Sequence, residues 1–269
     1  MNGASATNAA RAAKNSTPLR ALARLGFATN GLLHILIGGL AISIAQSGGS
    51  GSADQSGALG QLASTPGGVF LLWTVVIGLF ALGVWLLVAA FLIQGGDPKR
   101  KWAHRGVEAS KAVVYIVLAF TAFTFARGSS TSASSSTSDA SATLISSPGG
   151  VVVLFAAGII VLAIGAFFVY KGLARKFTSD ISVPAEPARK MVIALGVTGY
   201  VSKGIALGVV AILLMVAAVT RDSSKSTGLD GALKALAALP FGAIILNAVG
   251  IGLIAYGLYC FVRAWRARL

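Results

Sequence analysis

The sequence predicts an all-α fold, a polytopic membrane protein with six transmembrane helices. Three observations support this prediction. Of the 269 residues, 55% are hydrophobic and 11% are charged, and the mean hydropathy is +0.81; soluble domains carry about 25% charged residues. Six apolar runs are long enough to cross a hydrocarbon core of about 30 Å. The chain also repeats one two-helix unit three times.

The six apolar runs follow one another along the chain, at residues 25–45, 67–93, 106–126, 149–170, 192–219 and 241–262. The first run follows a basic leader and reaches the small-residue pattern Ser43, Ile44, Ala45, so a cleaved signal peptide is the alternative interpretation. Because this run has equivalents deep inside the chain, we favour an uncleaved helix.

The basic residues predict the orientation of the helices. Sixteen of the 22 Lys and Arg residues lie at the two termini and in the second and fourth links, and four lie in the first, third and fifth links. Since basic links remain on the cytoplasmic side, we expect a multi-pass cell-membrane protein with both termini cytoplasmic. Such short clusters favour the lipid bilayer as partner, with anionic lipids at the cytoplasmic face, over nucleic acid. They identify no protein partner.

The internal repeat appears when the start of each odd-numbered run is aligned: "GFATNGLLH" from Gly26, "VEASKAVVY" from Val107 and "GYVSKGIAL" from Gly199. The sixth residue of each aligned stretch is small. A proline follows the fifth position after 36, 37 and 37 residues, and a glycine follows each proline after 17. In chain order these landmarks are Gly31, Ala112 and Gly204; Pro66, Pro148 and Pro240; and Gly83, Gly165 and Gly257.

Each landmark has a physical reason. Proline suits the first turn of a helix, so the three prolines are predicted to begin the even-numbered helices. A glycine near mid-membrane lets two helix backbones approach closely, so Gly83, Gly165 and Gly257 are predicted to pack repeat against repeat. Three parallel repeats with both termini on one side predict a pseudo-three-fold bundle about an axis along the membrane normal.

These landmarks divide the chain into a disordered cytoplasmic N-terminus (1–18) and three repeats (19–95, 99–176 and 189–269). Repeat 2 contains a Ser/Thr-rich outer loop at 128–147, which has too few large apolar residues to order itself. We therefore expect a flexible outer loop, with a glycan-bearing loop as the alternative.

The chain resembles the three-copy, two-helix membrane repeat of the domain of unknown function 1206 family, of actinobacterial type. The resemblance rests on "RLGFATNGLLHILIGGLA", "HRGVEASKAVVYIVLAF" and "LGVTGYVSKGIALGVVA" and covers about residues 19–269. The first copy departs from the others by Asn30, and the second by Val107 and Glu108. The resemblance implies a membrane fold and implies no activity.

Polar residues stand on one stripe of each odd-numbered helix, because residues three or four apart share a helix face. The candidates for a polar vestibule are Asn30, His34, Glu108, Lys111, Tyr115, Tyr200 and Lys203. In one interpretation Glu108 and Lys111 form a surface ion pair and Lys203 extends its ammonium to the membrane boundary. In the other, the stripes converge around a cytoplasm-facing vestibule for an anion or for protons that pass through His34.

Motifs for catalysis and metal binding are not found in the sequence. Cys260 is the only cysteine, and the two histidines, His34 and His104, lie in different contexts. No nucleophile elbow, phosphate-binding loop or paired catalytic carboxylates occur. We therefore expect no catalytic residue, metal or cofactor, and no enzyme. The predicted function is a non-catalytic scaffold that binds partners or lipids, and the alternative is a small transporter or channel.

Overall fold

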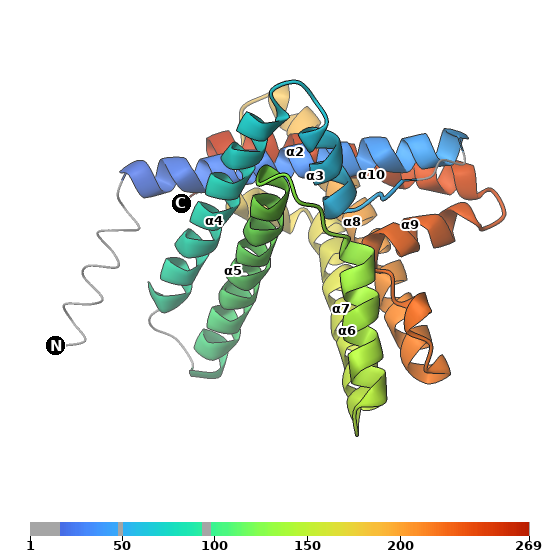
Figure 1. The fold of residues 1–269 in the computed structure, drawn as a ribbon. Coiled ribbons are helices and arrows are strands. Elements are labelled where there is room, and N and C mark those ends of the chain that lie inside the picture. Colours follow the sequence, from blue (N-terminus) through green and yellow to red (C-terminus); the bar gives the residue numbers. More distant parts are fainter. Residues whose placement is uncertain (1–16, 48–50, 93–97, 269) are drawn as a thin grey trace. The chain divides into compact units, whose positions relative to one another are not determined.

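The computed structural model describes residues 17–47, 51–92 and 98–268. Within these residues, six helices are long and apolar enough to cross a membrane, which confirms the predicted number of spans. The protein is a helical, multi-pass membrane protein. The six helices are α2 (Thr17–Ser47), α4 (Gly68–Leu92), α5 (Pro98–Ala126), α7 (Gly150–Leu173), α8 (Ala188–Thr220) and α10 (Gly242–Arg266) (Figure 1).

The odd-numbered spans begin earlier than their apolar runs. Helix α5 begins at Pro98, eight residues before the predicted start at 106, and α2 begins at Thr17. The basic segments at these starts are rich in Ala, Leu, Lys and Arg, which are good helix formers, so the helix continues beyond the apolar run. Residues 17 and 18 of the predicted disordered N-terminus therefore belong to α2, and residues 1–16 lie outside the described part of the chain.

A short helix precedes each even-numbered span: α3 (Gln55–Ala63), α6 (Ala133–Ser146) and α9 (Gly228–Ala237). The prediction of a flexible loop at 128–147 is therefore wrong, because α6 occupies most of it. Serine hydroxyls hold α6 in place. Ser138 donates to the carbonyl of Ser223 at 3.0 Å, and the hydroxyls of Ser141 and Ser226 lie 2.7 Å apart. These hydrogen bonds act together with Leu144 and Ile145 at the end of α6, which pack against the buried residues Leu154, Ala217 and Ala218.

The three prolines precede the helices rather than beginning them, which corrects their predicted position. Helices α4, α7 and α10 start two residues after Pro66, Pro148 and Pro240. In each repeat the carbonyl before the proline accepts from the N–H three residues on, at 2.9, 3.0 and 2.7 Å. The residue after the proline has a φ of 76°, 75° and 61°. This is a type II turn, in which proline and then a left-handed residue occupy the two central positions.

The chain forms two compact units. Unit 1 contains residues 1–30, 62–129 and 260–269, and unit 2 contains residues 31–61 and 130–259. Helix α4 packs along α5 in unit 1, and α7 packs along α8 in unit 2 (Figure 1). Helices α2 and α10 each contribute to both units. The pseudo-three-fold bundle concerns the placement of all six helices together and stays a prediction.

Glycine contacts connect the repeats in a cyclic order, and each contact lies inside one unit. A Cβ placed on Gly83, Gly165 or Gly257 would approach a carbonyl oxygen of the following repeat to 3.2, 2.9 or 2.5 Å. Those oxygens belong to Ala112, Gly204 and Gly31, the small sixth residues of the aligned stretches. The contacts therefore pass from repeat 1 to repeat 2, from repeat 2 to repeat 3, and from repeat 3 to repeat 1.

Candidate functional site

The seven predicted vestibule residues are divided between the two units. Unit 1 holds Asn30, Glu108, Lys111 and Tyr115, and unit 2 holds His34, Tyr200 and Lys203. Within unit 2, His34 contacts Lys203, and within unit 1, Glu108 forms an ion pair with Lys111.

Lys203 and His34 form a close polar contact between α8 and α2. The Nζ of Lys203 lies 3.2 Å from the Nε2 of His34 and 4.3 Å from the centre of the Tyr256 ring. It also lies 5.3 Å from the centre of the Phe168 ring. A charged ammonium has three donors and no acceptor, so it can bond His34 only in the neutral tautomer that leaves Nε2 without a proton. The aromatic faces and the imidazole together stabilise the ammonium.

Tyr200 is the centre of an aromatic cluster beside this contact. Its side chain is 1% exposed, and the ring of Phe177 stacks on it at 5.5 Å with an interplanar angle of 13°. Tyr256 and Tyr259 meet it edge to face at 5.2 and 5.6 Å. The absence of a side chain at Gly199 makes room for Tyr256, whose backbone lies 2.5 Å from where a Cβ would be. Tyr200 therefore packs three elements together: α8, α10 and the link after α7.

The unit 1 residues make contacts both within α5 and between helices. The Nζ of Lys111 lies 2.7 Å from the Oε1 of Glu108, three residues earlier on α5, and the two side chains are 49% and 28% exposed. Asn30 donates to the Sγ of Cys260 at 3.5 Å, which joins α2 to α10. Tyr115 packs against a buried cluster of Ala23, Phe27, Leu82, Trp85, Leu86, Ala112 and Ala267.

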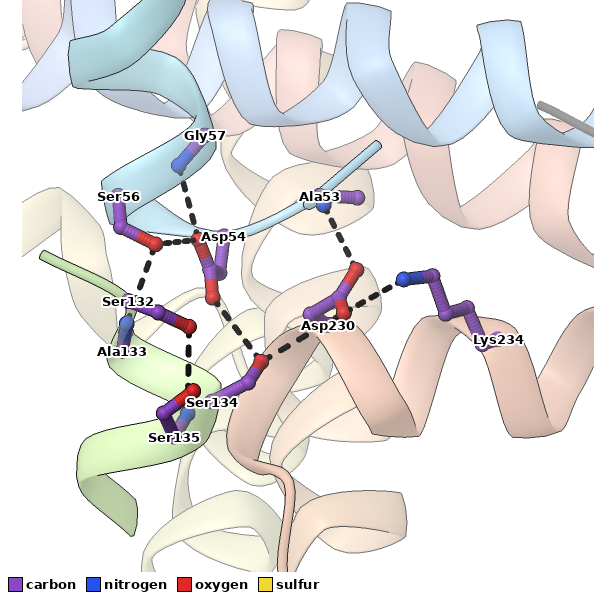
Figure 2. Close-up of polar contacts among 10 residues, drawn as sticks. All are labelled: Ala53, Asp54, Ser56, Gly57, Ser132, Ala133, Ser134, Ser135, Asp230 and Lys234. Atoms are coloured by element: carbon purple, nitrogen blue, oxygen red, sulfur yellow. Dashed lines mark hydrogen bonds and ion pairs between the residues drawn. The ribbon is translucent and has the colours of Figure 1, made fainter. Parts of the chain in front are cut away.

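A second polar centre, absent from the sequence prediction, joins the three short helices in unit 2 (Figure 2). We call it the short-helix network, and it consists of Asp54, Ser56, Ser134, Asp230 and Lys234. Asp54 is 1% exposed and Asp230 is 5% exposed. Buried carboxylates are costly unless they are hydrogen-bonded or paired.

Asp54 immediately precedes α3 and caps its first turn. Its Oδ1 accepts from the hydroxyl of Ser56 at 2.6 Å and from the backbone N–H of Gly57 at 2.9 Å. An acid before a helix satisfies backbone N–H groups that have no partner inside the helix. Ser56 also accepts from the N–H of Ala133 at 3.2 Å, which attaches α3 to the start of α6.

Asp230 connects α9 to the segment before α3. Its Oδ1 accepts from the backbone N–H of Ala53 at 2.9 Å, and its Oδ2 accepts from the ammonium of Lys234 at 2.8 Å. The hydroxyl of Ser134 on α6 lies 3.5 Å from Asp230 Oδ2 and 3.4 Å from Asp54 Oδ2 (Figure 2). The signal in the sequence was the presence of an acid in each of these links, Asp54 in the first and Asp230 in the fifth.

Asp222, just after α8, provides a pH-dependent prediction outside the membrane-spanning segments. It accepts from the hydroxyl of Ser224 at 2.6 Å and from the backbone N–H of Ser224 at 3.0 Å, and these bonds lower the pKa of its carboxyl below the usual value. The stabilisation that these bonds give to the folded state is present above the usual carboxyl pKa and is lost as pH falls through the lowered pKa of Asp222.

Replacement of Ser224 by alanine is expected to raise the pKa of Asp222 towards its ordinary value, because both the hydroxyl and its hydrogen bond are removed. The carboxyl 13C shift as a function of pH measures it, with Ser223→Ala as control; an unchanged pKa in Ser224→Ala contradicts the prediction.

Three two-helix repeats, closely packed at small residues and carrying buried polar contacts, define a class of repeat-built multi-pass membrane proteins. Residues 25–92, 109–175 and 198–267 match the family Domain of Unknown Function (DUF1206), and the chain belongs to this family. The protein called "Uncharacterized protein YxxB" of Bacillus subtilis (strain 168) is 32% identical over 252 residues, which cover 91% of this chain and 90% of that protein. No solved structure matches the chain.

Proposed function

We propose that the protein is a non-catalytic scaffold of the cell membrane, with both termini in the cytoplasm, which binds anionic lipids and protein partners through its surfaces. The observation that carries the proposal is the environment of Lys203. Its ammonium lies against His34, Tyr256 and Phe168, so side chains of packed helices compensate its charge. A lysine used in this way stabilises the contact between α2 and α8 and requires no substrate.

The other polar residues of the spans support the same proposal. Glu108 and Lys111 bond each other within α5, an arrangement worth about 0.2–0.5 kcal/mol on a helix surface. Asn30 bonds Cys260 across α2 and α10. The close approach of backbones at Gly165 and Gly204 also favours a rigid pair of helices over one that moves during transport.

A small transporter or channel is the second candidate, and one observation favours it. His34 and Lys203 are both titratable, lie in direct contact and belong to membrane-spanning helices, and Lys203 is partly exposed. Ionisable groups inside a membrane frequently line proton or ion paths. This candidate requires water to reach Lys203 from the cytoplasmic side.

Water access to Lys203 distinguishes the two candidates. In a Cys260→Ala background, single cysteines replace Asn30, Lys203 and Ile205, and a membrane-impermeant thiol reagent is added to the cytoplasmic face of oriented vesicles. Ile205 is 43% exposed and serves as the control that faces lipid. The scaffold proposal expects slow labelling at all three positions. If the cysteines at positions 30 and 203 are labelled much faster than the cysteine at position 205, water reaches Lys203, and the result supports the transporter or channel instead.

Flux measurements give an independent result. Vesicles that contain the purified protein and an internal pH-sensitive or chloride-sensitive dye are expected to pass protons and chloride no faster than empty vesicles. Lys203→Met keeps a long unbranched side chain and removes the charge. Flux in the wild type that disappears in Lys203→Met overturns the scaffold proposal.

A further inference from the structure

The link between α7 and α8 carries an exposed set of cations at one end of the helix pair. Arg175, Lys176, Arg189 and Lys190 are all exposed, and we call them the juxtamembrane basic surface. Lys171 is partly buried instead and bonds Asp180 at 2.7 Å, which neutralises that acid. One other acid, Glu186, is present in the link. The surface therefore keeps a net positive charge.

The link is anchored to the helices, so two of these cations have a defined position. Phe177, in the short 3-10 helix η1 (Lys176–Asp180), is fully buried. Its ring occupies the space left by the missing side chain of Gly196, and its carbonyl accepts from the hydroxyl of Tyr259 at 3.1 Å. Because Arg175 and Lys176 directly precede Phe177, this anchor holds them at the end of α7.

The apolar side of α7 continues up to the basic surface. Phe167, Tyr170 and Leu173 are 55%, 51% and 64% exposed on α7. The Nζ of Lys176 lies 4.7 Å from the centre of the Tyr170 ring, so a cation lies directly beside an aromatic side chain of the kind found at membrane interfaces. Arg175 has a φ of 54°, a left-handed conformation that usually selects glycine at a helix end, yet a long cationic side chain occupies it.

We propose that the juxtamembrane basic surface binds the phosphate of an anionic phospholipid, whose acyl chains lie along Phe167, Tyr170 and Leu173. The charge of the surface complements a phosphate, and the exposed apolar side of α7 complements the chains. Arg175 and Lys176 make the main contacts with the phosphate. Arg189 and Lys190, at the start of α8, add to the positive potential around it. This inference rests on the proposed scaffold function and names its lipid partner.

The test compares two charge-matched double variants. Arg175→Gln with Lys176→Gln removes two cations of the basic surface. Arg221→Gln with Lys225→Gln is the control, because Arg221 also has a φ of 54° at the end of α8 and Lys225 also lies in a short 3-10 helix, η2 (Ser223–Lys225). Both variants lose two positive charges from a link that follows a long helix, α7 or α8. Purified full-length protein is equilibrated with vesicles of equal phosphatidylglycerol and phosphatidylcholine, and the lipids that remain bound are counted by native mass spectrometry.

The wild type and the Arg221/Lys225 control are expected to retain phosphatidylglycerol over phosphatidylcholine. In the Arg175/Lys176 variant the ratio of bound phosphatidylglycerol to bound phosphatidylcholine is expected to fall at least about tenfold. Each cation near an anionic lipid surface contributes about a fivefold factor to the binding constant. An unchanged preference in the test variant, or equal losses in both variants, overturns the inference. The flux and labelling measurements do not depend on this result, so failure of lipid binding and failure of the scaffold proposal are distinguishable.

Discussion

Replacement of Gly204 by alanine is expected to destabilise the contact between α7 and α8 strongly. A Cβ at position 204 would lie 2.6 Å from the carbonyl oxygen of Gly165 and 2.9 Å from the backbone nitrogen of Val169. Backbone atoms cannot rotate away, so the two helices must separate. Overpacking of this kind costs typically about 1–3 kcal/mol, and we expect the upper end of that range. The free energy of unfolding in mixed micelles, followed by far-UV circular dichroism, measures the loss.

Gly208→Ala, one turn further along α8, is the matched control. A Cβ at position 208 has no heavy atom within 4 Å. Alanine also has the higher helix propensity, so this variant is expected to be as stable as the wild type or slightly more stable. Equal losses of stability in the two variants indicate a general effect of alanine on α8 and contradict a specific contact with Gly165.

The repeat pattern predicted the close helix contacts because it placed small residues at equivalent depths. Gly165 and Gly204 stand at positions of the repeat that hold a small residue in every copy. Hydropathy identified the six spans for a similar reason, since only length and apolar content decide whether a helix can cross a membrane. Both signals are properties of the chain that do not depend on which side chains meet.

The pairing of particular polar side chains between repeats could not be predicted in this way. His34 and Lys203 lie 169 residues apart in the sequence and on different stripes, and their contact depends on how α2 and α8 face each other. Tyr256, whose ring lies beside both of them, belongs to an apolar run in which nothing distinguishes it from lipid-facing residues. The aromatic environment of Lys203 is thus a product of packing.

The short-helix network was missed because acids and serines between transmembrane helices are usually solvated. Asp54 and Asp230 are nearly fully buried instead. Polar composition predicts disorder only when the polar groups have no partners in the folded chain. Here the three short helices supply those partners to one another, so the residues that predicted a loop are the ones that order it.

Asp230→Ala is expected to destabilise this arrangement by about 3 kcal/mol. The substitution removes the acceptor of the Ala53 backbone N–H and of the Lys234 ammonium, and it leaves the N–H of a buried residue without its present partner. Hydrogen bonds to charged groups contribute about 1.5–3 kcal/mol each, and an orphaned buried donor adds its own cost. Hydrogen exchange at Ala53 and along α9 is expected to accelerate strongly, while exchange in α4 and α5, which belong to the other unit, is expected to change little.

Two further variants separate the carboxylate's contacts from a general effect of charge. Asp139→Ala removes an exposed acid from α6 and is expected to change stability by less than about 0.5 kcal/mol. Asp230→Asn keeps one acceptor oxygen and removes the charge, so it is expected to retain part of the stability that Asp230→Ala loses. If Asp230→Ala is no less stable than Asp139→Ala, and the exchange at Ala53 is unchanged, the bonds of Asp230 do not hold α9 to the segment before α3. The order of the short helices then depends on their other contacts, among them the serine hydrogen bonds between α6 and the link that contains η2.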